Sequence, residues 1–328
     1  MPPPPRAPVP DNLRGLLLLL VGAGHGLEPL LASSASARAV YSALYLFHVP
    51  AFAALSGHVS RARWPAPTQW RALLWPLLLG QFLYVALDVA WLGHPLSPRW
   101  LAQPYWVLWF LLSLASWRAL LPLLVRLRWP LAWAVGAALA AGLLPQVGYA
   151  LSLSRTLVFL PCFLAGHLAP PSWLAWLRGR AGRVAAATAF LFLGAWAVAL
   201  ATGVLPFPDT RLLYGSADYG ALAMTPLQGM AARGAVLACA LALTAAAWAW
   251  SPGGSGPLAH LGAASLWPYV VHGLLLRALP LQPWLFAVPA VLQLAVGVSA
   301  GVGAVLAPAA WLLRTRSAVP ERDRSVAR

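Results

Sequence analysis

The sequence predicts an all-α integral membrane protein, a bundle of about ten transmembrane helices. The N-terminus and the C-terminus are both expected in the cytoplasm. Hydrophobic residues make up 61% of the 328 residues and charged residues 9%, which leaves almost no polar face for a soluble domain of this size. The apolar residues fall in runs of about 20 residues, the length that a helix needs to cross a bilayer. Most basic residues lie in short loops between those runs.

Ten apolar segments are expected to cross the membrane, and together they form one domain over residues 12–313. They are residues 12–32, 40–59, 72–92, 105–125, 130–147, 156–170, 184–204, 229–250, 261–279 and 285–313. Residues 1–11 form a proline-rich tail that we expect to be extended and disordered in the cytoplasm, and residues 314–328 form a basic cytoplasmic tail.

The first segment also has features of a cleavable signal peptide. Arginines precede its apolar run, and Ala35-Ser36-Ala37 is similar to a cleavage site. His25, Glu28 and Pro29 interrupt the run, however, so we expect the segment to remain as the first transmembrane helix.

All 22 basic residues are arginines, which excludes a Schiff-base lysine, a P-loop lysine and a lysine general base. With the N-terminus inside, fifteen arginines lie on the cytoplasmic side, the bias typical of multi-pass proteins. Five lie outside: Arg38, Arg99, Arg155, Arg211 and Arg277. Topology therefore explains the net charge of +15 better than a nucleic acid partner does. Cys162 and Cys239 lie in apolar stretches without motif spacing, so neither a disulfide framework nor a metal site is expected.

Arg14 and His25 are the ionisable residues around which the first segment is organised. Ten residues separate them, so on a helix they share a face, within ~20° of each other and roughly 16 Å apart along the axis. An ionisable side chain in hydrocarbon costs free energy, so a histidine near mid-membrane indicates a functional site. The alternative is a packed or cavity-lining histidine.

Other polar residues inside the apolar segments have weaker interpretations. His48 precedes Pro50, which we expect to kink the second segment, and His272 follows Pro268; each either supports the site or bonds to a neighbouring helix. Arg118 lies near the inner end of its segment, so its long side chain can reach the membrane–water interface. Asp88 and Arg233 lie toward outer ends and are candidates to pair with each other or to line an acceptor cavity. The outer loop 205–222 carries residue types that bind sugars, namely Asp209, Arg211, Tyr214, Asp218 and Tyr219.

A family resemblance rests on four stretches. Residues 11–14 (Asp-Asn-Leu-Arg) and 24–30 (Gly-His-Gly-Leu-Glu-Pro-Leu) resemble the first helix of the acyltransferase 3 family, whose hallmark is an arginine or lysine, ten residues and a histidine. Residues 47–57 look like its second helix, and Leu266 to His272 resembles its late Ser-Leu-x-x-Tyr-x-x-His segment. Residues 109–118 are similar to the middle span of its fucose 4-O-acetylase-like branch.

The resemblance implies a cell-membrane O-acyltransferase. Such an enzyme moves an acyl group, most often acetyl, from cytosolic acyl-CoA to a hydroxyl of a carbohydrate or glycan. Acyl-CoA (acetyl-CoA) is then a co-substrate, and no bound cofactor or metal is expected. On this resemblance His25 matches the catalytic histidine and Arg14 its basic partner.

The chemistry of the residues agrees with these roles. Imidazole is suited to taking a hydroxyl proton near neutral pH, so His25 acts either as this base or as the carrier of the acyl group. Glu28 is three residues on, within reach to orient the ring. Arg14 is suited to a phosphate of coenzyme A, and Arg61 and Arg63 either add to that anion site or are plain topology signals.

A second class of function stays open. Apolar spans with a few buried ionisable groups are also typical of a transporter or flippase of a lipid-linked sugar or small solute, with His25 in a proton relay. A purely structural subunit is disfavoured by the buried charges.

Overall fold

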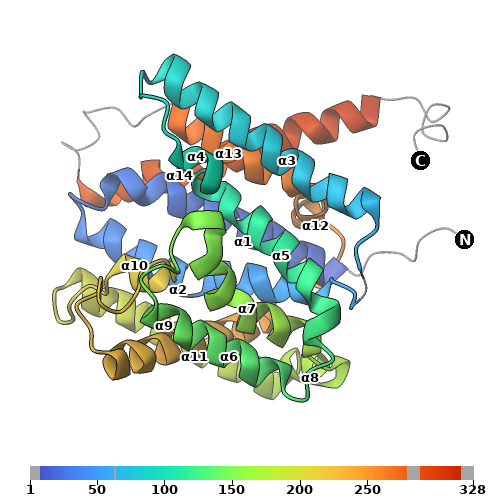
Figure 1. Ribbon diagram of the computed structural model, residues 1–328, viewed down its shortest axis with the longest axis vertical. Coiled ribbons are helices and arrows are strands. Elements are labelled where there is room, and N and C mark those ends of the chain that lie inside the picture. The colour runs from blue at the N-terminus through green and yellow to red at the C-terminus, as the bar shows by residue number, and fades with distance from the viewer. Residues whose placement is uncertain (1–7, 63, 279–288, 319–328) are drawn as a thin grey trace, which may run out of the picture.

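The computed structural model describes residues 8–62, 64–278 and 289–318, and every regular element in these ranges is helical (Figure 1). The longer helices are α1 (Pro8–Leu27), α2 (Ala35–His58), α3 (Pro67–Ala86), α5 (Trp109–Leu124), α6 (Pro130–Ala140), α7 (Leu153–Leu168), α9 (Arg180–Ala201), α11 (Pro226–Trp250), α13 (Leu266–Ala278) and α14 (Ala290–Ala318). The short elements are η1 (Glu28–Leu30), η2 (Leu87–Trp91), α4 (Arg99–Ala102), η3 (Trp106–Leu108), η4 (Ala141–Leu143), η5 (Ala150–Ser152), α8 (Pro171–Leu177), α10 (Thr210–Leu213) and α12 (Pro257–Ala263).

The protein is a multi-pass membrane protein. Eight helices of the described ranges are long and apolar enough to cross a bilayer. Large apolar side chains cover the outside of α9, where Leu191, Phe192 and Val198 are exposed, as a surface in contact with lipid requires. The expected segment 130–147 is a shorter helix, Pro130–Leu143, and segment 261–279 is divided between α12 and α13. The count of ten spans and their orientation therefore stay predictions.

The first helix begins at Pro8, four residues before the expected start of the first segment. Proline lacks a backbone N–H, but the N–H groups of a first helical turn have no partner in the helix, so Pro8 and Pro10 are tolerated there. At the other end of the chain, α14 continues to Ala318, beyond the expected boundary at residue 313.

Helix α1, from the N-terminal part of the chain, packs against α12 and α14 from its C-terminal part. It runs antiparallel to α14 across a row of glycines, because Gly22 meets Gly301 and Gly26 meets Gly297 (Figure 1). A Cβ atom at Gly26 or Gly301 would overlap a carbonyl oxygen of the facing helix. Small residues let two backbones approach this closely, which is typical of helix packing in membranes.

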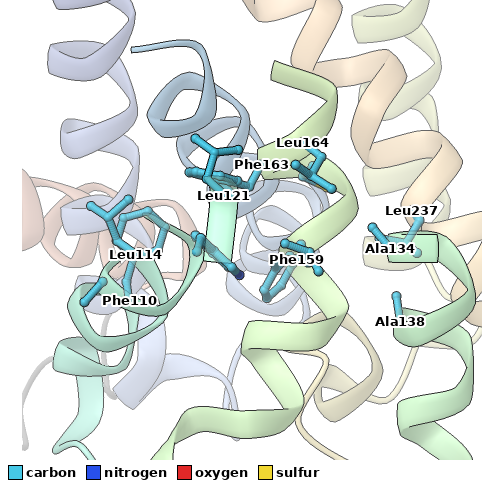
Figure 2. Close-up of a cluster of buried hydrophobic side chains, with 14 of the residues drawn as sticks. Phe110, Leu114, Leu121, Ala134, Ala138, Phe159, Phe163, Leu164 and Leu237 are labelled. Atoms are coloured by element: carbon cyan, nitrogen blue, oxygen red, sulfur yellow. The ribbon is translucent and has the colours of Figure 1, made fainter. Parts of the chain in front are cut away.

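The main hydrophobic core lies among α5, α6, α7 and α11, and it holds α2 against them. Phe110 and Leu114 from α5 pack with Phe159 and Phe163 from α7 (Figure 2). The α2 and α7 backbones also cross closely, since a Cβ atom at Gly57 would overlap the carbonyl of Phe163. This core fixes the positions of α2 and α5, two of the helices that surround His25.

Candidate functional site

His25 and Glu28 form the centre of the candidate site, at the end of α1 that is far from Arg14. The chain changes from α-helix at Leu27 to the tighter turn η1 at Glu28, and the Glu28 carboxylate lies 2.7 Å from Nδ1 of His25. An ionised carboxylate only accepts hydrogen bonds, so Nδ1 carries the hydrogen and the neutral ring has its lone pair on Nε2. The contact predicted from the three-residue spacing is present.

Two tyrosines of α2 support Glu28. The Tyr41 and Tyr45 hydroxyls each lie 3.3 Å from Oε1 of Glu28, and the Tyr45 hydroxyl is equally far from Nδ1 of His25. Tyr41 also hydrogen-bonds to Tyr214, which follows α10. The carboxylate therefore has several partners, which restrict the orientation of the His25 ring.

The two other candidate histidines both lie beside this centre. The ring of His272 is 5.5 Å from that of His25; its Nδ1 lies 3.2 Å from the Pro268 carbonyl, and its buried Nε2 has no hydrogen-bond partner in the described part of the chain. His48 is buried, bonds through Nδ1 to the carbonyl of Leu44, and has its ring edge against Tyr45. Each of these histidines thus hydrogen-bonds to a carbonyl of its own helix and also lies near the site.

A cavity of about 300 Å³ lies next to His25, and we call it the central cavity. Its walls are mostly apolar. Its ionisable side chains are His25, Glu28, His48 and Arg155, and several tyrosines and tryptophans add further polar groups. It is lined by Val21, His25, Glu28, Tyr45, His48, Val49, Phe52, Trp106, Trp109, Phe110, Arg155, Phe159, Leu213, Tyr214 and Tyr269.

A second cavity, of about 770 Å³, contains Arg14, and we call it the Arg14 cavity. Arg14 lies 2.9 Å from the Asp11 carboxylate and shares the cavity with Arg61 and Arg118. Arg118 donates to the Ser60 hydroxyl at 3.2 Å. Three arginines against one aspartate make this cavity suited to an anion. Arg118 was not predicted to take part in such a site, and Arg63 lies outside the described residues.

The third cavity, of about 1010 Å³, lies at the other end of α1, and we call it the Arg277 cavity. The buried Asp88 carboxylate lies 2.6 Å from Nε of Arg277 and 3.6 Å from His94. The predicted pairing of Asp88 with Arg233 is therefore wrong. Asp88 sits in the π-helical turn η2, which aims it toward α13.

Arg233 is buried between α6 and the outer loop instead. It donates to the carbonyls of Ala138 and Ala217, and its guanidinium lies 4.7 Å from the centre of the Tyr219 ring. Tyr219 in turn donates to the carbonyl of Leu139. Two backbone carbonyls and an aromatic face contact this cation, whereas its buried Nε has no hydrogen-bond partner in the described ranges. Through these contacts Arg233 joins the loop to α6.

The outer loop 205–222 does not gather its polar residues into one sugar site. Tyr214 lines the central cavity, whereas Tyr219 is buried against Arg233. Asp209 and Arg211 pair on the surface at 2.6 Å, and the hydrogen bonds from Arg211 hold the pKa of the Asp209 carboxyl below its usual value.

Arg155 and Trp106 are two site residues that the sequence did not single out. The Arg155 guanidinium lies between the rings of Trp109 and Tyr149, 5.0 and 4.8 Å from their centres. Trp106 lies 4.6 Å from the His25 ring and has a φ of +35°, a conformation unfavourable for a bulky residue. Both line the central cavity and the Arg277 cavity, together with His25 and Glu28.

No group of three or more His, Cys, Asp or Glu side chains suited to a metal ion occurs in the described ranges. The acid–base residues near the central cavity are instead His25, Glu28, His48 and His272.

The three cavities follow one another along α1. The Arg14 cavity includes Pro10 and Arg14, and the Arg277 cavity includes His25 and Pro29 at the other end of the helix. The central cavity shares lining residues with each of them. The site is thus a path through the bundle with the His25–Glu28 pair part of the way along it.

Comparison with known families gave a match that covers most of the chain. The acyltransferase 3 model, described as an acyltransferase domain, matches residues 9–313. No curated protein and no solved structure matched the chain. Every residue that lines the three cavities falls within the matched range.

Proposed function

Since the chain belongs to the acyltransferase 3 family, and is therefore a membrane acyltransferase, we propose that it transfers an acetyl group from cytosolic acetyl-CoA to a hydroxyl of a carbohydrate or glycan. Within the family we assign it to the fucose 4-O-acetylase-like branch. The observation that carries the proposal is the path of three cavities, with an anion-binding end, a mostly apolar middle and the His25–Glu28 pair beyond it.

The Arg14 cavity is suited to the coenzyme A end of the donor. Arg14, Arg61 and Arg118 offer guanidinium groups to its phosphates, and the positive-inside bias puts this end in the cytoplasm. The arm between the diphosphate and the thioester has about 13 bonds and extends on the order of 16 Å. This equals the rise of α1 from Arg14 to His25, roughly 16 Å, so a donor held at Arg14 reaches the central cavity with its acyl group.

The Arg277 cavity is suited to the acceptor. Trp100, Trp106 and Tyr149 give it aromatic faces for a sugar ring, and Gln103 and His94 add polar groups. On the predicted orientation this cavity faces the outside of the cell. His25 borders both the central cavity and the Arg277 cavity, so the acceptor hydroxyl and the thioester meet at its ring.

In the proposed step, Nε2 of His25 takes the proton of the acceptor hydroxyl while the hydroxyl oxygen attacks the thioester carbonyl carbon. The tetrahedral intermediate collapses, the C–S bond breaks, and the thiolate takes the proton from the imidazolium. Glu28 keeps Nδ1 protonated and stabilises the imidazolium. Arg155 faces the same cavity and is suited to the negative charge that develops on the carbonyl oxygen. In the other version of the step, His25 carries the acyl group before the acceptor takes it.

Membrane vesicles with labelled acetyl-CoA on the Arg14 side test the proposal. We expect label to appear in a surface glycan or glycolipid, and to be lost in the His25→Gln variant, which cannot take a proton. Comparing surface glycans and lipids of cells with and without the protein then identifies the acceptor by its missing ester. Uptake or export of a solute without labelled product would overturn the proposal in favour of a transporter.

A further inference from the structure

Three aromatic side chains separate the Arg14 cavity from the central cavity. Phe52 from α2, Phe110 from α5 and Tyr269 from α13 line both cavities, and no other residue of the described ranges does. Their ring centres are 5.5 Å apart for Phe52 and Phe110, 6.2 Å for Phe110 and Tyr269, and 6.5 Å for Phe52 and Tyr269. Each ring therefore contacts the two others, and the three close a triangle across the path.

The boundary at the other end of the central cavity has a different chemistry. There the shared residues are His25, Glu28, Trp106 and Arg155, three of them ionisable. In the aromatic triangle the one polar group is the Tyr269 hydroxyl, which already donates to the carbonyl of Val107. The triangle is thus an apolar barrier, and it lies on the side from which the donor would come.

We propose that Phe52, Phe110 and Tyr269 form a gate that is closed in this structure, that the acyl-pantetheine arm must part it to reach His25, and that the width of its opening restricts the acyl group to a short one. The identity of the arm rests on the proposed function above. The closure of the gate rests on the ring contacts alone.

Phe52 is the member of the gate that moves. Phe110 is buried in the main core, with its ring 5.8 Å from that of Trp117, and Tyr269 is held by its bond to the Val107 carbonyl. Phe52 is half-buried, and outside the triangle it packs on core residues without a further ring contact or a hydrogen bond in the described ranges. Rotation of Phe52 removes two of the three ring contacts while the backbone stays in place. Phe52 is therefore the specificity-determining residue for the size of the acyl group.

A thiol-accessibility experiment tests the closure. In full-length protein that carries Cys162→Ala and Cys239→Ala, a Ser56→Cys variant places a thiol in the Arg14 cavity and a Val49→Cys variant places one in the central cavity. A charged, membrane-impermeant methanethiosulfonate reagent is added from one side at a time, and the side that labels Ser56→Cys defines the Arg14 side. From that side we expect Val49→Cys to react slowly.

Opening the gate should then expose the inner thiol. Adding Phe52→Ala is expected to raise the labelling rate of Val49→Cys from the Arg14 side about tenfold or more, with a smaller rise for Phe52→Leu, which keeps apolar volume. Phe47→Ala is the matched control, because this ring lies on the same helix but packs on Phe190. Labelling of Ser56→Cys at the original rate shows that each variant is folded.

The acyl group is tested separately, with acetyl-CoA and hexanoyl-CoA as donors in the protein with its native cysteines. Phe52→Ala is expected to raise the rate ratio of hexanoyl to acetyl transfer about tenfold or more. An unchanged ratio would overturn the role in specificity. Equal labelling of Val49→Cys with and without Phe52→Ala would overturn the gate. Failure of transfer with every donor, combined with a clear labelling difference, would overturn the proposed function and leave the closed barrier standing.

Discussion

The Glu28→Gln substitution is the sharpest test of the proposed catalytic centre, because it removes the negative charge beside His25 and changes almost no volume. Glu28 lies 2.7 Å from Nδ1 of His25, and in the proposed step its charge stabilises the imidazolium that forms when His25 takes the hydroxyl proton. A hydrogen bond to a charged group contributes about 1.5–3 kcal/mol. Since about 1.4 kcal/mol is a factor of ten in rate, we expect kcat to fall about 10- to 100-fold.

His25→Gln removes the proton acceptor itself and should lower kcat by about 10²-fold or more. Because Glu28 acts through His25, adding Glu28→Gln to His25→Gln should have little further effect. Steady-state acyl transfer by the purified protein in proteoliposomes gives the four rates of this double-mutant cycle. Asp209→Asn is the control, since this carboxylate pairs with Arg211 on the surface.

Three results would refute the reasoning. Substantial acyl transfer by a correctly inserted His25→Gln protein would remove His25 as the base and move the search to His48 or His272, which lie beside it. Full additivity of the two substitutions would show that Glu28 contributes independently of His25. A change in KM alone would likewise contradict a role in the transition state.

Three further predictions concern the donor, the topology and the packing. Arg14→Ala should raise KM for acyl-CoA about 10- to 100-fold with little change in kcat. Arg14→Lys should partly restore the low KM. The control is Arg178→Ala, because Arg178 binds the Ser251 carbonyl, and this variant should leave KM unchanged. Reporter fusions after Arg63, Arg183 and Arg316 should all report the cytoplasm, and an external signal at two of them would overturn the orientation. Gly301→Ala should lower the free energy of unfolding by about 1–3 kcal/mol, because the added Cβ would overlap the Gly22 carbonyl. Gly303→Ala is the control and should not lower it, since a Cβ there meets open space. Equal melting temperatures of the two variants in detergent would contradict this prediction.

The sequence predicted the parts of the site that depend on one helix. Helical spacing was enough to place Glu28 against His25 and to separate Arg14 from His25, and the motifs identified the family that the domain match confirms. The roles of these residues stay predictions. The class of fold followed from composition, because a chain so rich in apolar residues has few other ways to satisfy its backbone.

Contacts between segments that are distant in the chain could not be predicted from the sequence. Asp88 pairs with Arg277 rather than Arg233 because a π-helical turn and the packing of α13 decide which cation is near. Arg155 looked like a plain outer arginine, and only the fold shows that the rings of Trp109 and Tyr149 both lie against its guanidinium. No local pattern carries that information.

The glycine contact between α1 and α14 joins two segments that are made at very different times during synthesis. His25 lies on α1, but Gly22 and Gly26 meet their partners on α14, and His272 comes from α13. At 5–20 residues per second, the roughly 270 residues between Gly26 and the facing glycines take on the order of 15–60 s to translate. Until then the face of α1 that packs on α14 has no partner, so the surroundings of His25 are complete only after α14 has been made.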